Sequence, residues 1–145
     1  MDLEILGLSR AQEYKPRNPT YAIRIKSGAF ADFDDSKILP LQESDLYTIV
    51  KYIFDDIDPG YIPPSRNPVM INEDIAGKIL EDFRREGLDK DTLLVHCSMG
   101  KNRSPAVGIA LNEIYNLGHD TGKLKRKFPE LNLYVYKMLL KVAKS

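Results

Sequence analysis

The sequence predicts an α/β fold in which a short, mostly parallel central sheet is flanked by helices. The order of its segments predicts it. Short segments with the character of strands alternate along the chain with segments whose apolar residues recur at helical spacing, and chains with this alternation form sheets with a parallel component. The length of 145 residues suits one domain, 1–145, which can bury a core of its own, and no internal repeat divides it.

The first part of the chain supplies three predicted strands and two predicted loops. Segment 2–8 is apolar enough for a short strand, 20–25 alternates in the strand period, and 47–54 is rich in β-branched and aromatic residues. A loop is expected at 27–35. The segment 55–68 is also a predicted loop, because its several prolines stop regular structure, and a loop of that length is usually functional or disordered.

The second part is predicted to hold three helices and one further strand. In each helix the apolar residues fall on one face at the spacing of an α-helix. Pro105 suits the first turn of the middle helix, and Gly87 and Gly118 are suited to ending the first and second helices. The helices are expected within 71–87, 104–118 and 130–143, and the strand at 92–95.

Charge and cysteine content exclude several classes of protein. The 21 basic side chains balance 21 acidic ones, which argues against a general nucleic-acid binder but allows a small positive pocket for one anion. A single cysteine rules out an internal disulfide, and with only two histidines it argues against a zinc cluster. No leader peptide or membrane-spanning apolar run is visible, so a soluble, cytoplasmic protein is expected. We also expect it to be a monomer.

The most informative stretch is HCSMGKNRS, residues 96–104. A predicted strand runs into Cys97, five residues follow, and Arg103 and Ser104 open a predicted helix. Backbone N–H groups of a curled loop, closed by a helix N-terminus, form a binding site for an anion, and ligands of such sheets bind beyond the carboxyl ends of the strands. Gly100 permits the backbone angles that a curl requires, and the planar guanidinium of Arg103 matches two phosphate oxygens.

These features predict a catalytic thiolate. The same N–H groups favour the ionised form of Cys97, and a thiolate beneath a bound phosphate can attack phosphorus in line. Ser104 is predicted to hydrogen-bond the sulfur and help it leave, whereas His96 is assigned a structural role in holding the loop. The alternative is a buried structural cysteine followed by a helix with an ordinary surface arginine. The predicted phosphate-binding residues are Ser98, Met99, Gly100, Lys101, Asn102 and Arg103.

The loop HCSMGKNRS resembles the signature of the protein tyrosine phosphatase superfamily, closest to its small dual-specificity-like members. Three further segments, LGLSRAQEY, FDDIDPGYIPP and FPELNLYVYK, are similar to segments of small microbial tyrosine-phosphatase-like proteins, so the resemblance covers most of the chain. It implies a tyrosine-phosphatase-like fold, catalysis without a metal, and a catalytic aspartate on a loop that precedes the signature.

Expelling an ester oxygen from phosphorus requires a proton donor, and the resemblance implies that an aspartate of FDDIDPG supplies it. Asp56 is the first choice because F-x-D-I is similar to the acid loop of the family, although its separation from Cys97 is longer than is common in dual-specificity members. Asp55 and Asp58 remain alternatives, and so does the interpretation that these acids are solvated turn residues. The weaker candidates are Asp32, Asp34 and Asp35.

The predicted function is a cysteine-dependent phosphomonoester hydrolase, a protein tyrosine or dual-specificity phosphatase that acts through a phosphocysteine intermediate on a phosphorylated protein or a small phosphomonoester. One alternative is a phosphoinositide, inositol-phosphate or RNA 5′-phosphatase with the same loop, which Lys101 would suit unless it is a plain exposed lysine. Another is a non-catalytic phosphate-binding module, against which the intact Cys97 and Arg103 argue. Arsenate reduction would need resolving cysteines that the sequence lacks.

Overall fold

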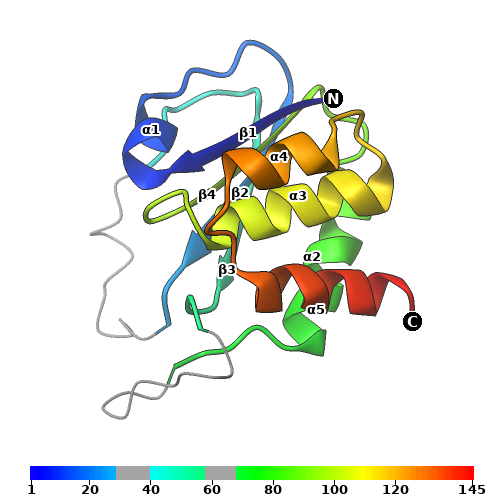
Figure 1. Ribbon diagram of the computed structural model, residues 1–145. Coiled ribbons are helices and arrows are strands. Elements are labelled where there is room, and N and C mark those ends of the chain that lie inside the picture. Colours follow the sequence, from blue (N-terminus) through cyan, green and yellow to red (C-terminus); the bar gives the residue numbers. More distant parts are fainter. Residues whose placement is uncertain (29–39, 58–67) are drawn as a thin grey trace.

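The computed structural model describes residues 1–28, 40–57 and 68–145, and the strands within them form one parallel sheet (Figure 1). The strands are β1 (Asp2–Gly7), β2 (Thr20–Lys26), β3 (Tyr47–Ile53) and β4 (Thr92–Cys97), in the spatial order β1-β4-β2-β3. At the carboxyl end of the sheet, Cys97 of β4 pairs in register with Gly7 of β1. The predicted α/β class with a parallel sheet is confirmed.

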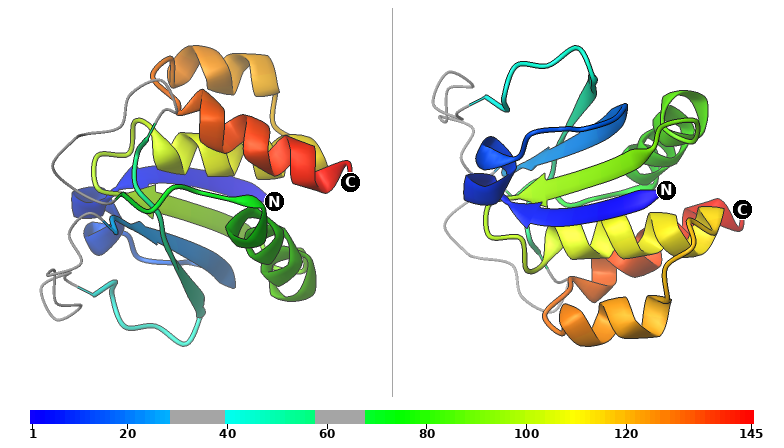
Figure 2. Two further views of the ribbon diagram at one scale, coloured as in Figure 1. Left: turned by 90° about the horizontal axis from the view of Figure 1, so that it is seen from below. Right: turned by 90° about the horizontal axis from the view of Figure 1, so that it is seen from above.

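Helices cover both faces of the sheet, as the two views of Figure 2 show. On one face, α2 (Glu73–Glu86) and α3 (Arg103–Tyr115) pack against strands, and α5 (Leu133–Ala143) contacts both of these helices. The short helix α4 (Thr121–Lys127) packs against α3, and α1 (Leu8–Glu13) follows β1 on the opposite face. Among the described helices, none has the length and apolar character needed to cross a membrane.

Two cores explain why β2 is buried along almost its whole length. Tyr21 and Ile23 face the larger core beneath α2 and α3, and they share one face, as the alternation in the sequence predicted. Ala22 points to the other face, where Ala11 of α1 and Leu94 of β4 cover it. Since an inner parallel strand is covered on both faces, it has no need of polar residues at alternate positions.

Asparagine caps explain where two helix boundaries depart from the prediction. The last helix begins after Asn132 rather than at 130, because the Oδ1 of this residue accepts a hydrogen bond from the Val135 N–H at 3.0 Å. The middle helix ends before the predicted Gly118, because Asn116 already adopts a left-handed φ of 53°. Helices α1 and α4 were not predicted, since six and seven residues are too few for a helical period to stand out.

Candidate active site

The loop after β4 is curled around the sulfur of Cys97. The Sγ atom lies 3.3 Å from the backbone nitrogen of Gly100 and 3.4 Å from that of Ser104, and both N–H groups donate to it. The side chain of Ser104 reaches the same sulfur, with its Oγ 3.2 Å away. Two residues that lie three and seven positions after the cysteine can meet one sulfur only if the chain between them folds back into a cup.

Gly100 makes this curl sterically feasible. Its φ is 74°, a value that residues with a side chain rarely adopt. A Cβ atom at this position would lie 2.5 Å from the backbone nitrogen of Gly7 and 2.8 Å from the carbonyl carbon of Leu6. The loop is therefore pressed against the end of β1, and the Leu8 N–H ties the two together by donating to the carbonyl oxygen of Ser98 at 3.1 Å.

The guanidinium of Arg103 is anchored by one nitrogen while another stays unpaired. Its Nη1 donates to the Oγ of Ser27 and to the carbonyl oxygen of Phe54, both at 2.9 Å. Its Nε is buried and has no hydrogen-bond partner within the described part of the chain. A buried donor without a partner costs about 1–3 kcal/mol, and an anion seated in the cup would remove that cost.

Local dipoles stabilise negative charge on the sulfur of Cys97. Helix α3 begins at Arg103, so the positive end of its dipole faces the loop. The residue at the N-cap position, Asn102, makes no side-chain cap, and the first-turn N–H of Ser104 is directed at the sulfur instead. The surroundings therefore suit a thiolate, or a phosphate dianion bound above it.

His96 is neutral and supports the loop backbone. Its Nε2 lies 2.8 Å from the Nε of Arg24 on β2, and its Nδ1 lies 3.4 Å from the carbonyl oxygen of Cys97. Because a guanidinium only donates, Nε2 is the acceptor and Nδ1 carries the proton. Burial, and then the charge of Arg24, lower the pKa of His96 to about 4. Near pH 7 the ring therefore holds the cysteine carbonyl rather than exchanging protons.

The two described aspartates of FDDID have different surroundings. Asp55 is buried; its Oδ2 accepts from the Val69 N–H at 2.7 Å, and its own N–H donates to the Val69 carbonyl oxygen at 2.6 Å. That residue therefore joins the two ends of the loop. Asp56 is exposed, and its Oδ1 accepts from the Nδ2 of Asn132 at 2.7 Å. The remaining candidates, Asp58, Asp32, Asp34 and Asp35, lie outside the described residues.

Two connections bring Asp56 to the curled loop. Phe54, two residues earlier, receives a hydrogen bond from Arg103 through its carbonyl oxygen. Asn132, which binds the carboxylate of Asp56, also donates its backbone N–H to the carbonyl oxygen of Asn102 at 2.9 Å. The end of β3 and the start of α5 therefore meet at the loop, and the exposed carboxylate stands at that junction.

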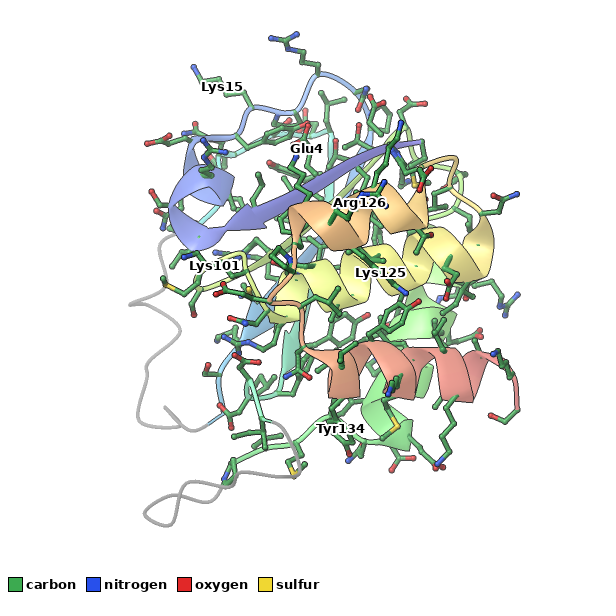
Figure 3. The ribbon with its side chains drawn as sticks, viewed as in Figure 1. Glu4, Lys15, Lys101, Lys125, Arg126 and Tyr134 are labelled. Atoms are coloured by element: carbon green, nitrogen blue, oxygen red, sulfur yellow. The ribbon has the colours of Figure 1, made fainter. Side chains whose placement is uncertain are left out.

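The other predicted phosphate-binding residues lie on the rim of the cup. The side chains of Ser98, Met99 and Lys101 are exposed, and Figure 3 shows Lys101 projecting outward from the loop. The side chain of Asn102 donates to the carbonyl oxygen of Glu130 at 2.7 Å. The backbone N–H groups of these residues are available to an anion in the cup.

Three contributors to the site were not predicted: Arg24, Ser27 and Asn132. Arg24 could have been predicted from the sequence, because a charged residue within an apolar strand needs a buried partner. Asn132 stands before an apolar helical run, which indicates a helix cap, but nothing local indicates its second contact with Asp56. Ser27 had no signal in the sequence.

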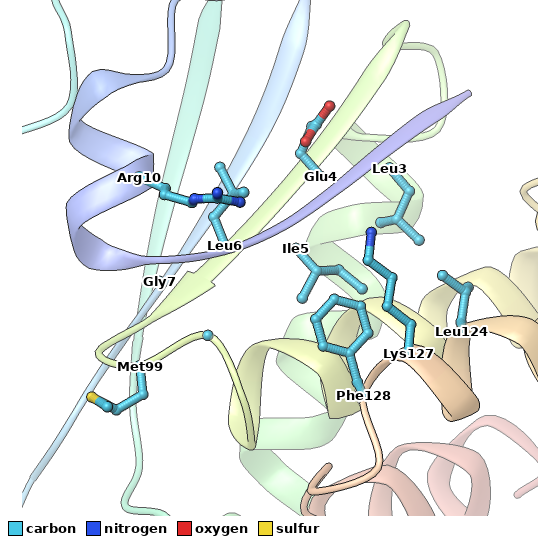
Figure 4. Close-up of a pocket in the computed structure, with 11 residues that line it drawn as sticks. Leu3, Glu4, Ile5, Leu6, Gly7, Arg10, Met99, Leu124, Lys127 and Phe128 are labelled. Carbon is cyan, nitrogen blue, oxygen red and sulfur yellow. The ribbon is translucent and has the colours of Figure 1, made fainter.

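A separate hollow of about 360 Å³ lies on the β1 side of the loop (Figure 4). Met99 and Gly100 line it together with residues of β1 and α4, and Arg10 and Lys127 lie at its sides. Cys97 is not among its lining residues. Neither here nor elsewhere in the described ranges do three or more His, Cys, Asp or Glu residues gather as they would around a metal ion.

Comparisons with known proteins give structural similarity but no match in sequence. No family model matches the chain, and no curated relative matches it. The chain is similar to a solved structure of Tk-PTP. That structure, described as "Crystal structure of Tk-PTP in the active form", shares 17% sequence identity at a TM-score of 0.49, over 99% of this chain and 92% of the other.

Proposed function

We propose that this protein is a cysteine-dependent phosphomonoester hydrolase of the protein tyrosine or dual-specificity phosphatase type. The observation that carries the proposal is the cup around Cys97, in which two backbone N–H groups and the hydroxyl of Ser104 meet one sulfur. The buried, unpaired Nε of Arg103 supports it, because a guanidinium anchored from one side is suited to hold phosphate oxygens from the other.

The proposed reaction has two steps. In the first, the thiolate of Cys97 attacks phosphorus, the bond to the ester oxygen breaks, and Asp56 gives that oxygen its proton. The loop N–H groups and Arg103 hold the transferring phosphoryl group. In the second step, a water molecule attacks the phosphorus of phosphocysteine while Asp56 takes a proton from that water. The bond between phosphorus and sulfur breaks, and the sulfur leaves as a thiolate that the hydroxyl of Ser104 stabilises. The products are inorganic phosphate and the regenerated enzyme.

We infer that the substrate is a phosphorylated protein or a small phosphomonoester and that the enzyme acts as a monomer without metal or cofactor. We also infer a cytoplasmic location, because a catalytic thiol must stay reduced and the chain has no second cysteine to protect it. Asp56 is the proposed acid rather than Asp55, since the carboxylate of Asp55 is buried and bound to the Val69 N–H.

A hydrolysis assay tests the proposal. Wild-type protein, Cys97→Ser and Asp56→Asn are compared on 4-nitrophenyl phosphate, a phosphotyrosine peptide, a phosphoserine peptide and an inositol phosphate, each with and without a metal chelator. We expect wild-type turnover that the chelator leaves unchanged and that vanadate inhibits competitively, with no turnover by Cys97→Ser. Full activity of Cys97→Ser, or loss of activity in chelator, would overturn the proposal.

A further inference from the structure

We propose that Asn132 is a positioning residue, which holds the carboxyl group of Asp56 in place for proton transfer at the curled loop. The proposal rests on the proposed function, and it adds to that function a residue from the far end of the chain. Asn132 lies 76 positions after Asp56 in sequence, yet the two side chains are 2.7 Å apart.

The side chain of Asn132 performs two tasks with its two polar atoms. Its Oδ1 accepts from the Val135 N–H at 3.0 Å and caps α5, which leaves its Nδ2 group as the donor on the other side. The Nδ2 group donates to the Oδ1 of Asp56 at 2.7 Å and to the carbonyl oxygen of Ile57 at 3.2 Å. The helix cap therefore sets the orientation of the amide, and the amide sets the position of the carboxyl group.

The backbone of Asn132 ties this arrangement to the loop. Its N–H donates to the carbonyl oxygen of Asn102 at 2.9 Å, and Asn102 directly precedes Arg103. A second hydrogen bond joins the same two segments, because the Nδ2 of Asn102 donates to the carbonyl oxygen of Glu130 at 2.7 Å. The same carbonyl oxygen of Asn102 also accepts from the Ala106 N–H at 3.3 Å in the first turn of α3. The acid and the loop thus share one rigid support.

The exposed carboxyl group of Asp56 must be held in a fixed position to transfer its proton efficiently. Without a partner, the side chain of Asp56 would sample several rotamers in solvent. The hydrogen bond from Asn132 holds Oδ1, while Oδ2 has no protein partner within the described ranges. In the protonated carboxyl group, the oxygen that accepts from the amide is the carbonyl type, so the transferable proton resides on Oδ2. Fixing one oxygen therefore presents the other to the leaving group.

The competing explanation is that Asn132 only caps α5. The chain offers a matched control, because Asn72 caps α2 in the same way: its Oδ1 accepts from the Ile75 N–H at 2.8 Å, and no side-chain hydrogen bond within the described residues joins it to the loop. Serine is a good helix cap but is too short to reach across to the carboxyl group. Both Asn132→Ser and Asn72→Ser should therefore keep their helix cap, and only the first should disturb the acid.

Leaving-group dependence separates the two explanations. Phenol is a poor leaving group that needs protonation, whereas 4-nitrophenolate leaves readily without it. For Asn132→Ser we expect kcat/KM to fall about 10- to 100-fold on phenyl phosphate and less than about threefold on 4-nitrophenyl phosphate. Asn72→Ser should match the wild type on both. Asn132→Asp, which keeps the cap and the size but replaces the donor with an acceptor, should reproduce the selective loss.

A double variant completes the test. In an Asp56→Asn background, Asn132→Ser should cause no further loss on phenyl phosphate, because the group it positions is already gone. Three outcomes would overturn the positioning role and leave the hydrolase assignment intact. They are an equal loss of kcat/KM on the two substrates, additive losses of kcat/KM in the double variant, and no loss in Asn132→Ser. A wild-type protein that hydrolyses neither substrate would overturn both, so the two failures are distinguishable.

Discussion

The hydroxyl oxygen of Ser104 lies 3.2 Å from the sulfur of Cys97 and 3.2 Å from the carbonyl oxygen of Leu6. Its single proton can serve only one of these acceptors at a time. While the sulfur is bonded to phosphorus, the carbonyl oxygen of Leu6 is the better acceptor. When the sulfur departs as a thiolate, the negatively charged sulfur becomes the better acceptor. Ser104 is therefore placed to stabilise the leaving sulfur in the second step of the proposed reaction.

This relationship predicts a changed rate-limiting step in Ser104→Ala. Losing one hydrogen bond to a charged sulfur should lower kcat by about 10- to 100-fold, since such a bond contributes about 1.5–3 kcal/mol. The first step should change much less, so phosphocysteine should accumulate. Rapid mixing with 4-nitrophenyl phosphate should show a burst of nitrophenol, and acid quenching should trap labelled protein. A drop in kcat without a burst would contradict the prediction.

Gly100→Ala should damage both the loop and the fold. The new Cβ atom would meet the backbone of β1 at 2.5 Å, at a φ of 74° that alanine rarely adopts. We expect the free energy of unfolding to fall by about 2 kcal/mol or more, and vanadate binding to be lost. Urea titration and vanadate inhibition measure the two effects.

Gly77→Ala is the matched control for that substitution. Gly77 lies inside α2, and a Cβ atom there would meet only the Val142 Cγ1 at an ordinary 3.9 Å. Because alanine is the better helix former, this variant should be more stable than the wild type by up to about 1 kcal/mol, with unchanged hydrolysis. A Gly100→Ala protein as stable as Gly77→Ala would show that the loop does not need its left-handed residue.

His96 should make the fold less stable in mild acid. Its pKa is about 4 in the folded protein and 6.5 in the absence of a shift, so the unfolded chain binds more protons between these values. Stability from this group is therefore fully present above pH 6.5 and is lost progressively as pH falls toward 4, by at most on the order of 3 kcal/mol. Urea titrations of the wild type and of His96→Asn at pH 7.0, 5.5 and 4.5 give the free energy of unfolding of each protein, which should fall more steeply with decreasing pH in the wild type. If the free energy of unfolding depended on pH equally in both proteins, His96 would not be a buried neutral residue.

Peroxide should inactivate the enzyme rapidly and largely irreversibly. Cys97 is the only cysteine in the chain, so its sulfenic acid cannot be protected by an internal disulfide and would need a backbone sulfenamide or an external thiol. After exposure to peroxide and removal of the oxidant, we expect added dithiothreitol to restore little activity. Full recovery would indicate a protective adduct and would count against this prediction.

Local patterns in the sequence were enough to predict the fold class and the loop. Strand and helix periods depend on neighbouring residues, so β2 and α2 stand out without any knowledge of tertiary contacts. The loop could be recognised because Cys97, Gly100 and Arg103 lie within one short segment. Even there, the steric reason for Gly100 came from the end of β1, which packs against it from far away in the chain.

Tertiary structure alone decided which residues support the chemistry. In the sequence, only the resemblance of F-x-D-I to the acid loop of the family favoured Asp56 over Asp55. Packing adds a physical difference, because it buries Asp55 against Val69 and brings Asp56 to Asn132, 76 positions away. The contact between Arg24 and His96 likewise joins residues 72 positions apart. Propensity and periodicity act over a few residues, whereas such pairings are set by the way that strands and helices pack together. The sequence by itself therefore determined the fold class and the loop that holds the proposed nucleophile, and the packing determined which distant residues contact that loop.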